Sequence, residues 1–221
     1  MPNKMTAHDD LLTDARILIF AKAPIAGLVK TRMLPALSAE QAAALHRQLV
    51  IETVATVTAA RLAPVVLYVS DDDPFWSSLD GNFELKKQAG GDLGERMHQA
   101  IKEQLALTNK VVLIGSDCPF IDRKYLEQAL QGLSSPAPTV VLGPASDGGY
   151  VLIASNAITA EMFCGVTWGS EFVLAQTLQK IDCLGWQYHC LAELNDIDRP
   201  EDLTLLAGLE NSELAKFGAG H

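Results

Sequence analysis

Short apolar runs rich in β-branched residues alternate along this chain with longer segments of helical period. The runs at 16–21, 65–69 and 111–114 are each followed by a loop and, further on, by a segment in which apolar residues recur every three or four positions. Parallel strands need long crossover connections, which are usually helices. The alternation therefore predicts an α/β fold in which helices flank a mostly parallel central sheet.

Local signals place the individual elements. Ser38 is followed three positions later by Gln41, which is the pattern of a capping box and predicts where the first long helix begins. Pro200 suits the first turn of a C-terminal helix. We expect strands at 16–21, 65–69, 83–87, 111–114, 139–142, 150–154 and 187–191, and helices at 38–61, 93–107, 122–133, 170–184 and from 200 onward.

The chain of 221 residues shows no internal repeat, linker or low-complexity tract. We therefore expect one domain over 16–214, a disordered leader over 1–15 and a frayed tail over 215–221. The leader lacks the basic start and apolar stretch of a signal peptide, and no run reaches the roughly 18 to 20 apolar residues of a membrane helix. Four cysteines without a C-x-x-C pair fit a reducing compartment. These features predict a cytoplasmic protein with no membrane partner.

Charge is unevenly distributed. The net charge of −10 argues against a nucleic-acid partner, because such proteins bind by neutralising phosphates. Yet the segment 22–32 carries three cations, Lys22, Lys30 and Arg32. It follows the first expected strand, and ligands of open α/β sheets bind beyond the carboxyl ends of strands. Lysine and arginine suit phosphate oxygens, and Gly27 allows close backbone approach, so we interpret the segment as a phosphate site. A solvated basic loop is the alternative.

Two further loops follow expected strands. Asp117 ends an apolar strand, where its carboxylate could hold a hard cation such as Mg²⁺ opposite substrate phosphates. The alternative is a capping role, for which Asp122 is better placed. Gly148 and Gly149 suit a tight turn or close contact with a ligand, and Asp147 and Tyr150 lie beside them. A turn alone would explain the glycines.

The remaining polar motifs are weaker. Asp196 and Asp198 precede the C-terminal helix, and because alternate residues of an extended chain point in opposite directions, we expect only one of them to face a metal. Gly91 and Arg96 belong to a glycine-rich helix start that could meet an anion or a base edge. His46 falls within an expected helix and is interpreted as a surface or packing residue. No serine-hydrolase, zincin or dinucleotide-binding motif is present.

Six segments, taken in order, resemble a family of small bacterial transferases. They are ILIFAKAPIAGLVKTRM, GGDLGERM, VVLIGSDCPFI, VVLGPASDGGYVLI, VTWGS and NDIDRPEDL, and the match extends over 16–206. Members of this family are known as glycosyltransferases of arsenosugar biosynthesis, or as transferases associated with radical-SAM and selenodomain proteins. The resemblance implies the nucleotide-diphosphosugar transferase fold, which is glycosyltransferase A-type and Rossmann-like. Nucleotidyltransferases are more distantly similar.

The resemblance also implies roles for individual residues. Asp117 would bind the metal, with Asp198 as a second carboxylate nearby. Nucleotide phosphates would be held by the loop that carries Lys22, Gly27, Lys30, Thr31 and Arg32. The chain departs from the D-x-D motif of metal-dependent glycosyltransferases, because Cys118 and Pro119 follow Asp117, as in the nucleotidyltransferase form. It also departs at the segment 168–170, to which we therefore assign no catalytic role.

Together these inferences predict a metal-dependent transferase that uses an activated nucleotide donor and Mg²⁺ or Mn²⁺. Glycosyl transfer from a nucleotide-sugar to a small-molecule acceptor is the leading interpretation. Nucleotidyl transfer to a phosphorylated substrate is the alternative, and a nucleotide-binding protein without turnover is a third. The expected catalytic residues are Asp117, Asp147 and Lys30. The expected nucleotide contacts include Gly91, Arg96, Gly148, Gly149 and Tyr150.

Overall fold

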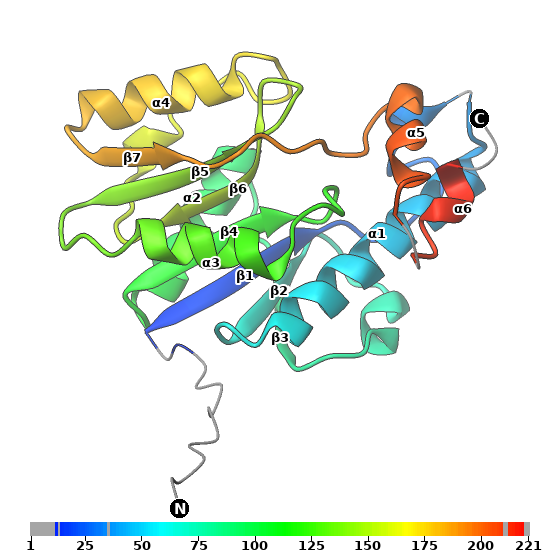
Figure 1. The fold of residues 1–221 in the computed structure, drawn as a ribbon, viewed down its shortest axis with the longest axis horizontal. Coiled ribbons are helices and arrows are strands. Elements are labelled where there is room, and N and C mark those ends of the chain that lie inside the picture. The colour runs from blue at the N-terminus through cyan, green and yellow to red at the C-terminus, as the bar shows by residue number, and fades with distance from the viewer. Residues whose placement is uncertain (1–11, 13, 35, 210–211, 219–221) are drawn as a thin grey trace, which may run out of the picture.

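A seven-stranded sheet forms the centre of the molecule (Figure 1). The structure, a computed structural model, describes residues 12, 14–34, 36–209 and 212–218. β6 runs antiparallel to both of its neighbours, and the other strand pairs of the sheet are parallel. The expected mostly parallel α/β sheet is thus confirmed. The strands lie in the order β3 (Phe83–Lys87), β2 (Val65–Val69), β1 (Ala15–Ala21), β4 (Lys110–Gly115), β6 (Tyr150–Ser155), β5 (Thr139–Pro144) and β7 (Gln187–Cys190).

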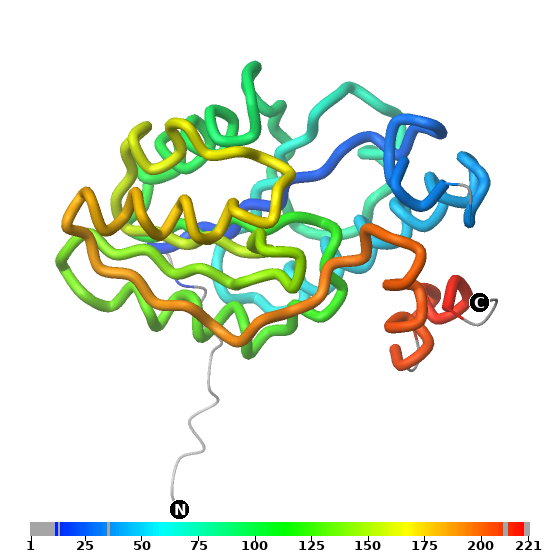
Figure 2. The backbone as a smooth tube through the Cα atoms, turned by 90° about the horizontal axis from the view of Figure 1, so that it is seen from above, coloured from blue at the N-terminus to red at the C-terminus, as the bar shows by residue number. Residues whose placement is uncertain are grey.

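Helices cover both faces of the sheet (Figure 2). Because successive side chains of a strand point to opposite faces, Ile17 and Ile19 of β1 pack under one pair of helices, and Leu18 and Phe20 under the other. Burial on both faces explains why these strands are continuous apolar runs. The first face packs against α1 (Ala39–Ala60) and α3 (Arg123–Gly132), and the second against α2 (Leu93–Leu105) and α4 (Val173–Cys183).

The expected helix boundaries hold where a cap defines them. The Ser38 side chain accepts a hydrogen bond from the Gln41 backbone N–H, and the Gln41 side chain accepts one from the Ser38 N–H, so the capping box of α1 is confirmed. α4 begins at Val173, three residues later than expected, because Ser170 closes a turn onto the Thr167 carbonyl. None of the helices in the described part of the chain has the length and hydrophobicity needed to span a bilayer.

The C-terminal segment differs from the expected single helix. Pro200 opens a 3₁₀ turn, Pro200–Asp202, which leads into the four-residue helix α5, Leu203–Leu206. The expected tail is helical over α6, Ala215–Gly218, and the rest of the tail, like most of the expected leader, lies outside the described residues. α5 and α6 lie beside the loop that follows β1 (Figure 1), and Met33 of that loop packs with Leu203 in a third apolar cluster.

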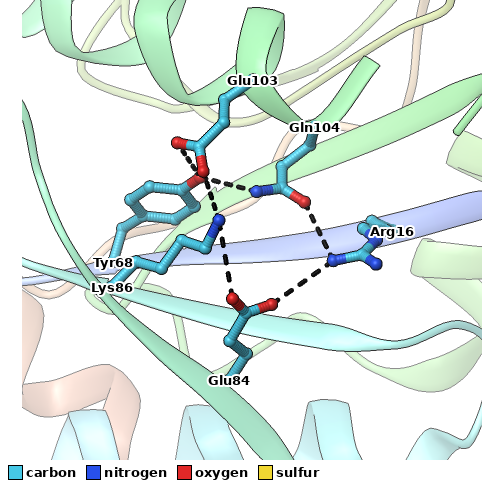
Figure 3. Close-up of polar contacts among 6 residues, drawn as sticks. All are labelled: Arg16, Tyr68, Glu84, Lys86, Glu103 and Gln104. Carbon is cyan, nitrogen blue, oxygen red and sulfur yellow. Dashed lines mark hydrogen bonds and ion pairs between the residues drawn. The ribbon is translucent and has the colours of Figure 1, made fainter. Parts of the chain in front are cut away.

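A buried polar network fastens α2 to the sheet (Figure 3). Gln104 of α2 is fully buried; its amide donates to the Tyr68 hydroxyl at 2.8 Å and accepts from Arg16 at 3.1 Å. Tyr68 in turn donates to Glu103, which also pairs with Lys86 of β3. The network joins β1, β2, β3 and α2, so it fixes the position of the helix whose first turn reaches the carboxyl ends of the strands.

Replacing Gln104 with methionine, which is similar in length, should therefore weaken the fold. The substitution leaves the Arg16 and Tyr68 groups with fewer partners, which typically costs about 1 to 3 kcal/mol. Urea unfolding followed by circular dichroism measures this change. The matched control is Gln99→Met on the exposed side of the same helix, expected to stay within about 0.5 kcal/mol of the parent. Equal effects of the two substitutions would contradict the role of the network.

Candidate functional site

The carboxyl ends of the central strands surround a cavity of about 350 Å³. Segments from distant parts of the chain meet there: the loop after β1, the loop after β4 and the start of β6 each contribute side chains, whereas Asp147 and Gly149 of the turn before β6 line an adjoining cavity. The residues that line it include Lys22, Lys30, His46, Gln88, Arg96, Gly115, Ser116, Asp117, Cys118, Tyr150, Asp196 and Asp198.

Lys30 is the organising residue of this cavity. Its side chain is only 3% exposed, and its ammonium lies 2.6 Å from Asp117 Oδ1 and donates to the Ile197 carbonyl, also at 2.6 Å. The Lys30 backbone is left-handed, with φ of 49°, a conformation that is uncommon outside glycine. The Ile197 N–H donates to the Asp117 carbonyl at 2.8 Å. Lys30 thus connects the loop after β1, the loop after β4 and the C-terminal segment.

Asp117 has one protected and one accessible side. Its Oδ1 atom is buried against Lys30, whereas the side chain as a whole is 46% exposed, so the exposure lies on the side of Oδ2. Burial alone would raise the pKa of this carboxyl, but the Lys30 ammonium and the His46 imidazole outweigh burial and hold the pKa well below its ordinary value. Asp117 is therefore a carboxylate throughout the physiological range, with an oxygen directed to the cavity.

His46 belongs to this site, contrary to its interpretation as a surface or packing residue. It is buried on α1, and its Nε2 lies 3.0 Å from the Lys22 carbonyl, which can only accept a hydrogen bond. Its Nδ1 lies 3.6 Å from Asp117 Oδ1. The available signal was its place among buried residues of α1, next to Leu45 and Leu49, which pack against the C-terminal segment. Helical periodicity alone does not show that this position meets the end of β4.

The two C-terminal carboxylates have different environments. Asp198 accepts a hydrogen bond from Arg32 at 2.8 Å, and this ion pair is partly exposed. Asp196 has no such cationic partner among the described residues. Burial, followed by the negative charge of Asp147, raises the pKa of Asp196 to about 6, with Asp117 and Asp198 contributing. Asp196 is therefore the carboxylate of this segment that would gain most from a bound cation.

The turn between β5 and β6 has a structural reason for its first glycine. Gly148 has φ of 87°, and a Cβ atom there would lie 2.2 Å from the Glu171 carbonyl oxygen. Asp147 accepts a hydrogen bond from the Gly149 N–H at 2.9 Å, which closes the turn. Tyr150 lines the cavity, and burial raises the pKa of its hydroxyl above the ordinary value.

Several expected site residues lie elsewhere. Gly27 and Thr31 are not among the described residues that line the cavity. Arg32 lines an adjoining hollow with Asp198. Gly91 lines a separate cavity at the start of α2, so it is not brought together with Lys30. Two polar residues that sequence reasoning did not select, His46 and Gln88, also line the cavity.

The donor set at this site suits a hard cation. No three His, Cys, Asp or Glu side chains of the described residues are grouped so that they could hold a metal by themselves. Mg²⁺ commonly takes only one or two protein carboxylates and completes its shell with water and substrate phosphates. Asp117 and Asp196 both line the cavity and offer oxygen ligands, so the residues present fit such an ion.

Asp196→Asn should stabilise the protein in a pH-dependent way. Because the folded pKa of about 6 lies above the ordinary value, ionised Asp196 weakens the fold above pH 6, and the penalty disappears as the pH falls towards 4. The free energy of unfolding should therefore rise on the order of 1 to 3 kcal/mol at pH 8 and remain unchanged near pH 4. Urea unfolding at the two pH values measures both.

Asp198→Asn is the matched control with the opposite sign. It breaks the partly exposed pair with Arg32, so the protein should lose up to about 1 kcal/mol at pH 8. If Asp196→Asn instead lowers the free energy of unfolding at pH 8 as much as Asp198→Asn does, then burial and the neighbouring carboxylates do not raise the pKa of Asp196.

Comparisons with solved structures agree with this architecture. A protein of Desulfovibrio desulfuricans G20 described as a candidate nucleotide-diphospho-sugar transferase has a TM-score of 0.83 and 29% identity, with 94% of each chain covered. The 4-diphosphocytidyl-2C-methyl-D-erythritol synthase of Anaerococcus prevotii DSM 20548 has a TM-score of 0.56 and 11% identity, covering 96% of this chain and 98% of that one. A nucleotidyl transferase of Methanothermobacter thermautotroptrophicus has a TM-score of 0.56 and 15% identity, with 85% and 93% covered.

The expected nucleotide-diphosphosugar transferase fold is therefore confirmed, since the Desulfovibrio structure superposes on 94% of this chain with a TM-score of 0.83. None of the curated proteins matches the sequence. A family model described as "Uncharacterized protein conserved in bacteria (DUF2064)" matches residues 53–170, which is more than half of the chain. The chain belongs to this DUF2064 family.

Proposed function

We propose that this protein transfers a group from an activated nucleotide and binds the nucleotide phosphates in the cavity at the carboxyl ends of β1 and β4. The observation that carries the proposal is the lining of that cavity. Lys22, Lys30 and Arg96 all line it, from two separate segments of an otherwise acidic chain, together with Asp117, whose Oδ1 atom is paired with Lys30. Cations grouped at strand ends, where open α/β sheets bind ligands, suit phosphate oxygens.

The net charge of −10 makes these short-range contacts decisive. A di- or triphosphate is repelled by the field of the whole chain, so its binding energy has to come from nearby cations and hydrogen-bond donors. Arg96 uses its Nε to donate to the Asp92 carbonyl and one terminal nitrogen to donate to Gln88. Its remaining N–H donors are available to a ligand.

We further propose that Asp117, with Asp196 as the second carboxylate, would hold Mg²⁺ or Mn²⁺ in this cavity. Asp196 is favoured over Asp198 because Asp198 is already paired with Arg32. When bound, the ion would neutralise phosphate charge and polarise the bond that breaks. The residues of the chain orient the donor: Lys30 holds Asp117 in place through Oδ1, and this leaves Oδ2 for the cation.

Glycosyl transfer is the leading reaction type, supported by the similarity to the Desulfovibrio protein. The acceptor oxygen would form a bond to the anomeric carbon, the bond from that carbon to the β-phosphate oxygen would break, and a nucleoside diphosphate would leave. Nucleotidyl transfer is the second candidate, supported by the cytidylyltransferase folds and by Cys118 and Pro119 after Asp117. There the acceptor attacks the α-phosphorus, and pyrophosphate leaves. The released product, nucleoside diphosphate or pyrophosphate, distinguishes the two. The link to arsenosugar chemistry stays a prediction.

Arg96→Ala should weaken nucleotide binding selectively. A charge-assisted hydrogen bond to phosphate contributes about 1.5 to 3 kcal/mol, so affinity for the best nucleotide in a screen of CTP, UTP, ATP and GTP should fall roughly ten- to hundredfold. The corresponding nucleoside has no phosphate, so its affinity should hardly change. Isothermal titration with Mg²⁺ and with EDTA measures the affinities and the contribution of the cation.

Lys102→Ala provides the control, because Lys102 is a cation of the same helix that is absent from the described lining of the cavity. It should bind every ligand as the parent does. If no nucleotide binds to the parent protein, or if Arg96→Ala weakens nucleotide and nucleoside alike, the phosphate role of this cavity is wrong. Binding without any turnover would favour the non-catalytic alternative.

A further inference from the structure

A second cavity, of about 240 Å³, adjoins the phosphate cavity. Phe20, Tyr150 and Asp196 line both, so the two spaces share a wall. The second cavity extends along β6 to the segment 168–170 and the start of α4, and neither Gln88 nor Arg96 lines it. Its size lies below the roughly 300 to 1,000 Å³ of pockets that enclose drug-sized ligands, so it suits a compact molecule.

The two cavities differ sharply in chemistry. The second is walled by Phe20, Met97, Trp168 and Val173, and none of the described residues that line it is a lysine, arginine or histidine. Its only charged lining residues in the described chain are Asp147 and Asp196. Asp147 keeps its side of the cavity negative even where a cation neutralises Asp196. An anionic ligand would therefore meet apolar walls and a like charge, without a compensating cation.

One buried polar atom also points to a ligand here. The indole nitrogen of Trp168 is buried and has no hydrogen-bond partner among the described residues, and Trp168 lines the cavity. The Tyr150 hydroxyl lies beside the buried Thr177 of α4 instead. The Trp168 ring packs against Gly94 of α2, where a Cβ atom would lie 2.6 Å from the ring. Buried donors without a hydrogen-bond partner are uncommon in folded proteins. A neutral oxygen of a bound molecule could accept the hydrogen bond that such a donor lacks.

We propose that this second cavity binds the acceptor, and that the acceptor is an uncharged, largely apolar alcohol. This inference rests on the proposed function, because it assigns the acceptor to the space beside the donor phosphates. The apolar body fills the space between Met97, Trp168 and Val173, and the hydroxyl faces the shared wall at Asp196. The cavity thereby disfavours phosphorylated and carboxylated acceptors.

The nucleobase of the donor is the competing occupant, and the structure favours the acceptor. Bases are recognised by hydrogen bonds to their edges, and the uncharged polar side chains of Gln88 and Ser116 line the phosphate cavity. The second cavity offers apolar walls and carboxylates instead. The donor therefore extends over β1 and β3, which leaves the side of β6 to the acceptor.

The test compares benzyl alcohol with benzoate, two probes of similar size that differ in charge. The chain has three tryptophans, so the indole N–H signal of Trp168 can be followed by nitrogen-15 NMR and assigned from its loss in Trp168→Phe, or by nuclear Overhauser contacts to Phe163 if that variant does not fold. Benzyl alcohol should shift the Trp168 signal saturably and leave Trp76 and Trp186 unchanged. Benzoate should bind at least about tenfold more weakly.

Charge variants tie this selectivity to the cavity. Asp147→Asn keeps an acceptor for the Gly149 N–H and removes the negative charge, so it should reduce the difference in affinity between benzyl alcohol and benzoate. Glu171→Gln, in the adjoining hollow, is the control and should leave that difference in affinity unchanged. Equal or tighter binding of benzoate to the parent protein, or no shift with either probe, would overturn the proposal. Displacement of benzyl alcohol by cytidine would overturn it in favour of the nucleobase.

Nucleotide titration of the same sample separates this inference from the proposed function. If CTP, UTP, ATP and GTP all fail to bind while the two probes differ as expected, the neutral-ligand cavity is supported and the nucleotide proposal fails. If a nucleotide binds and the probes do not differ, the nucleotide proposal stands and the acceptor class is wrong.

Discussion

The buried ammonium of Lys30 is the constraint on which the rest of the site depends. A charge taken out of water is costly unless it is paired and hydrogen-bonded, and Lys30 meets this requirement with the Asp117 carboxylate and the Ile197 carbonyl. These two partners lie 80 residues apart along the chain. A single side chain therefore brings together the loop after β1, the loop after β4 and the C-terminal segment. The unfavourable left-handed backbone conformation of Lys30 persists because these contacts hold the residue in place.

This arrangement separates the two sides of Asp117. The inner oxygen is committed to the fold, and the outer side faces the cavity in which Lys22 and Arg96 gather. The protein thus keeps an ionised carboxylate at the cavity without leaving a buried charge unpaired. Beyond the shared wall, the apolar cavity under α4 lacks a basic residue among those described. The sheet edge therefore carries two adjoining cavities, and among the described residues Lys22, Lys30 and Arg96 line the first of them alone.

Much of the fold could be predicted from local pattern. The expected strands agree with the structure to within two residues. The inner strands are buried on both faces and therefore have to be apolar throughout, whereas the edge strands β3 and β7 are largely exposed. The meeting of Lys30, Asp117 and Tyr150 also followed, since the ends of neighbouring strands share an edge. The burial of Lys30 did not, because lysine is rarely buried and its partners are distant in sequence. Similarly, only the position of Arg32 in the structure shows that Asp198, and not Asp196, already forms an ion pair.

A double-mutant cycle of Lys30→Met and Asp117→Asn, followed by urea unfolding at pH 7, tests most directly whether this pair organises the site. Each single substitution leaves one charge without its partner and should lower the free energy of unfolding by at least about 2 kcal/mol. The double mutant should lose less than the sum of the two, with a coupling energy of about 1 kcal/mol or more. Additivity within about 0.5 kcal/mol would show that the two residues do not depend on one another, and would contradict the account.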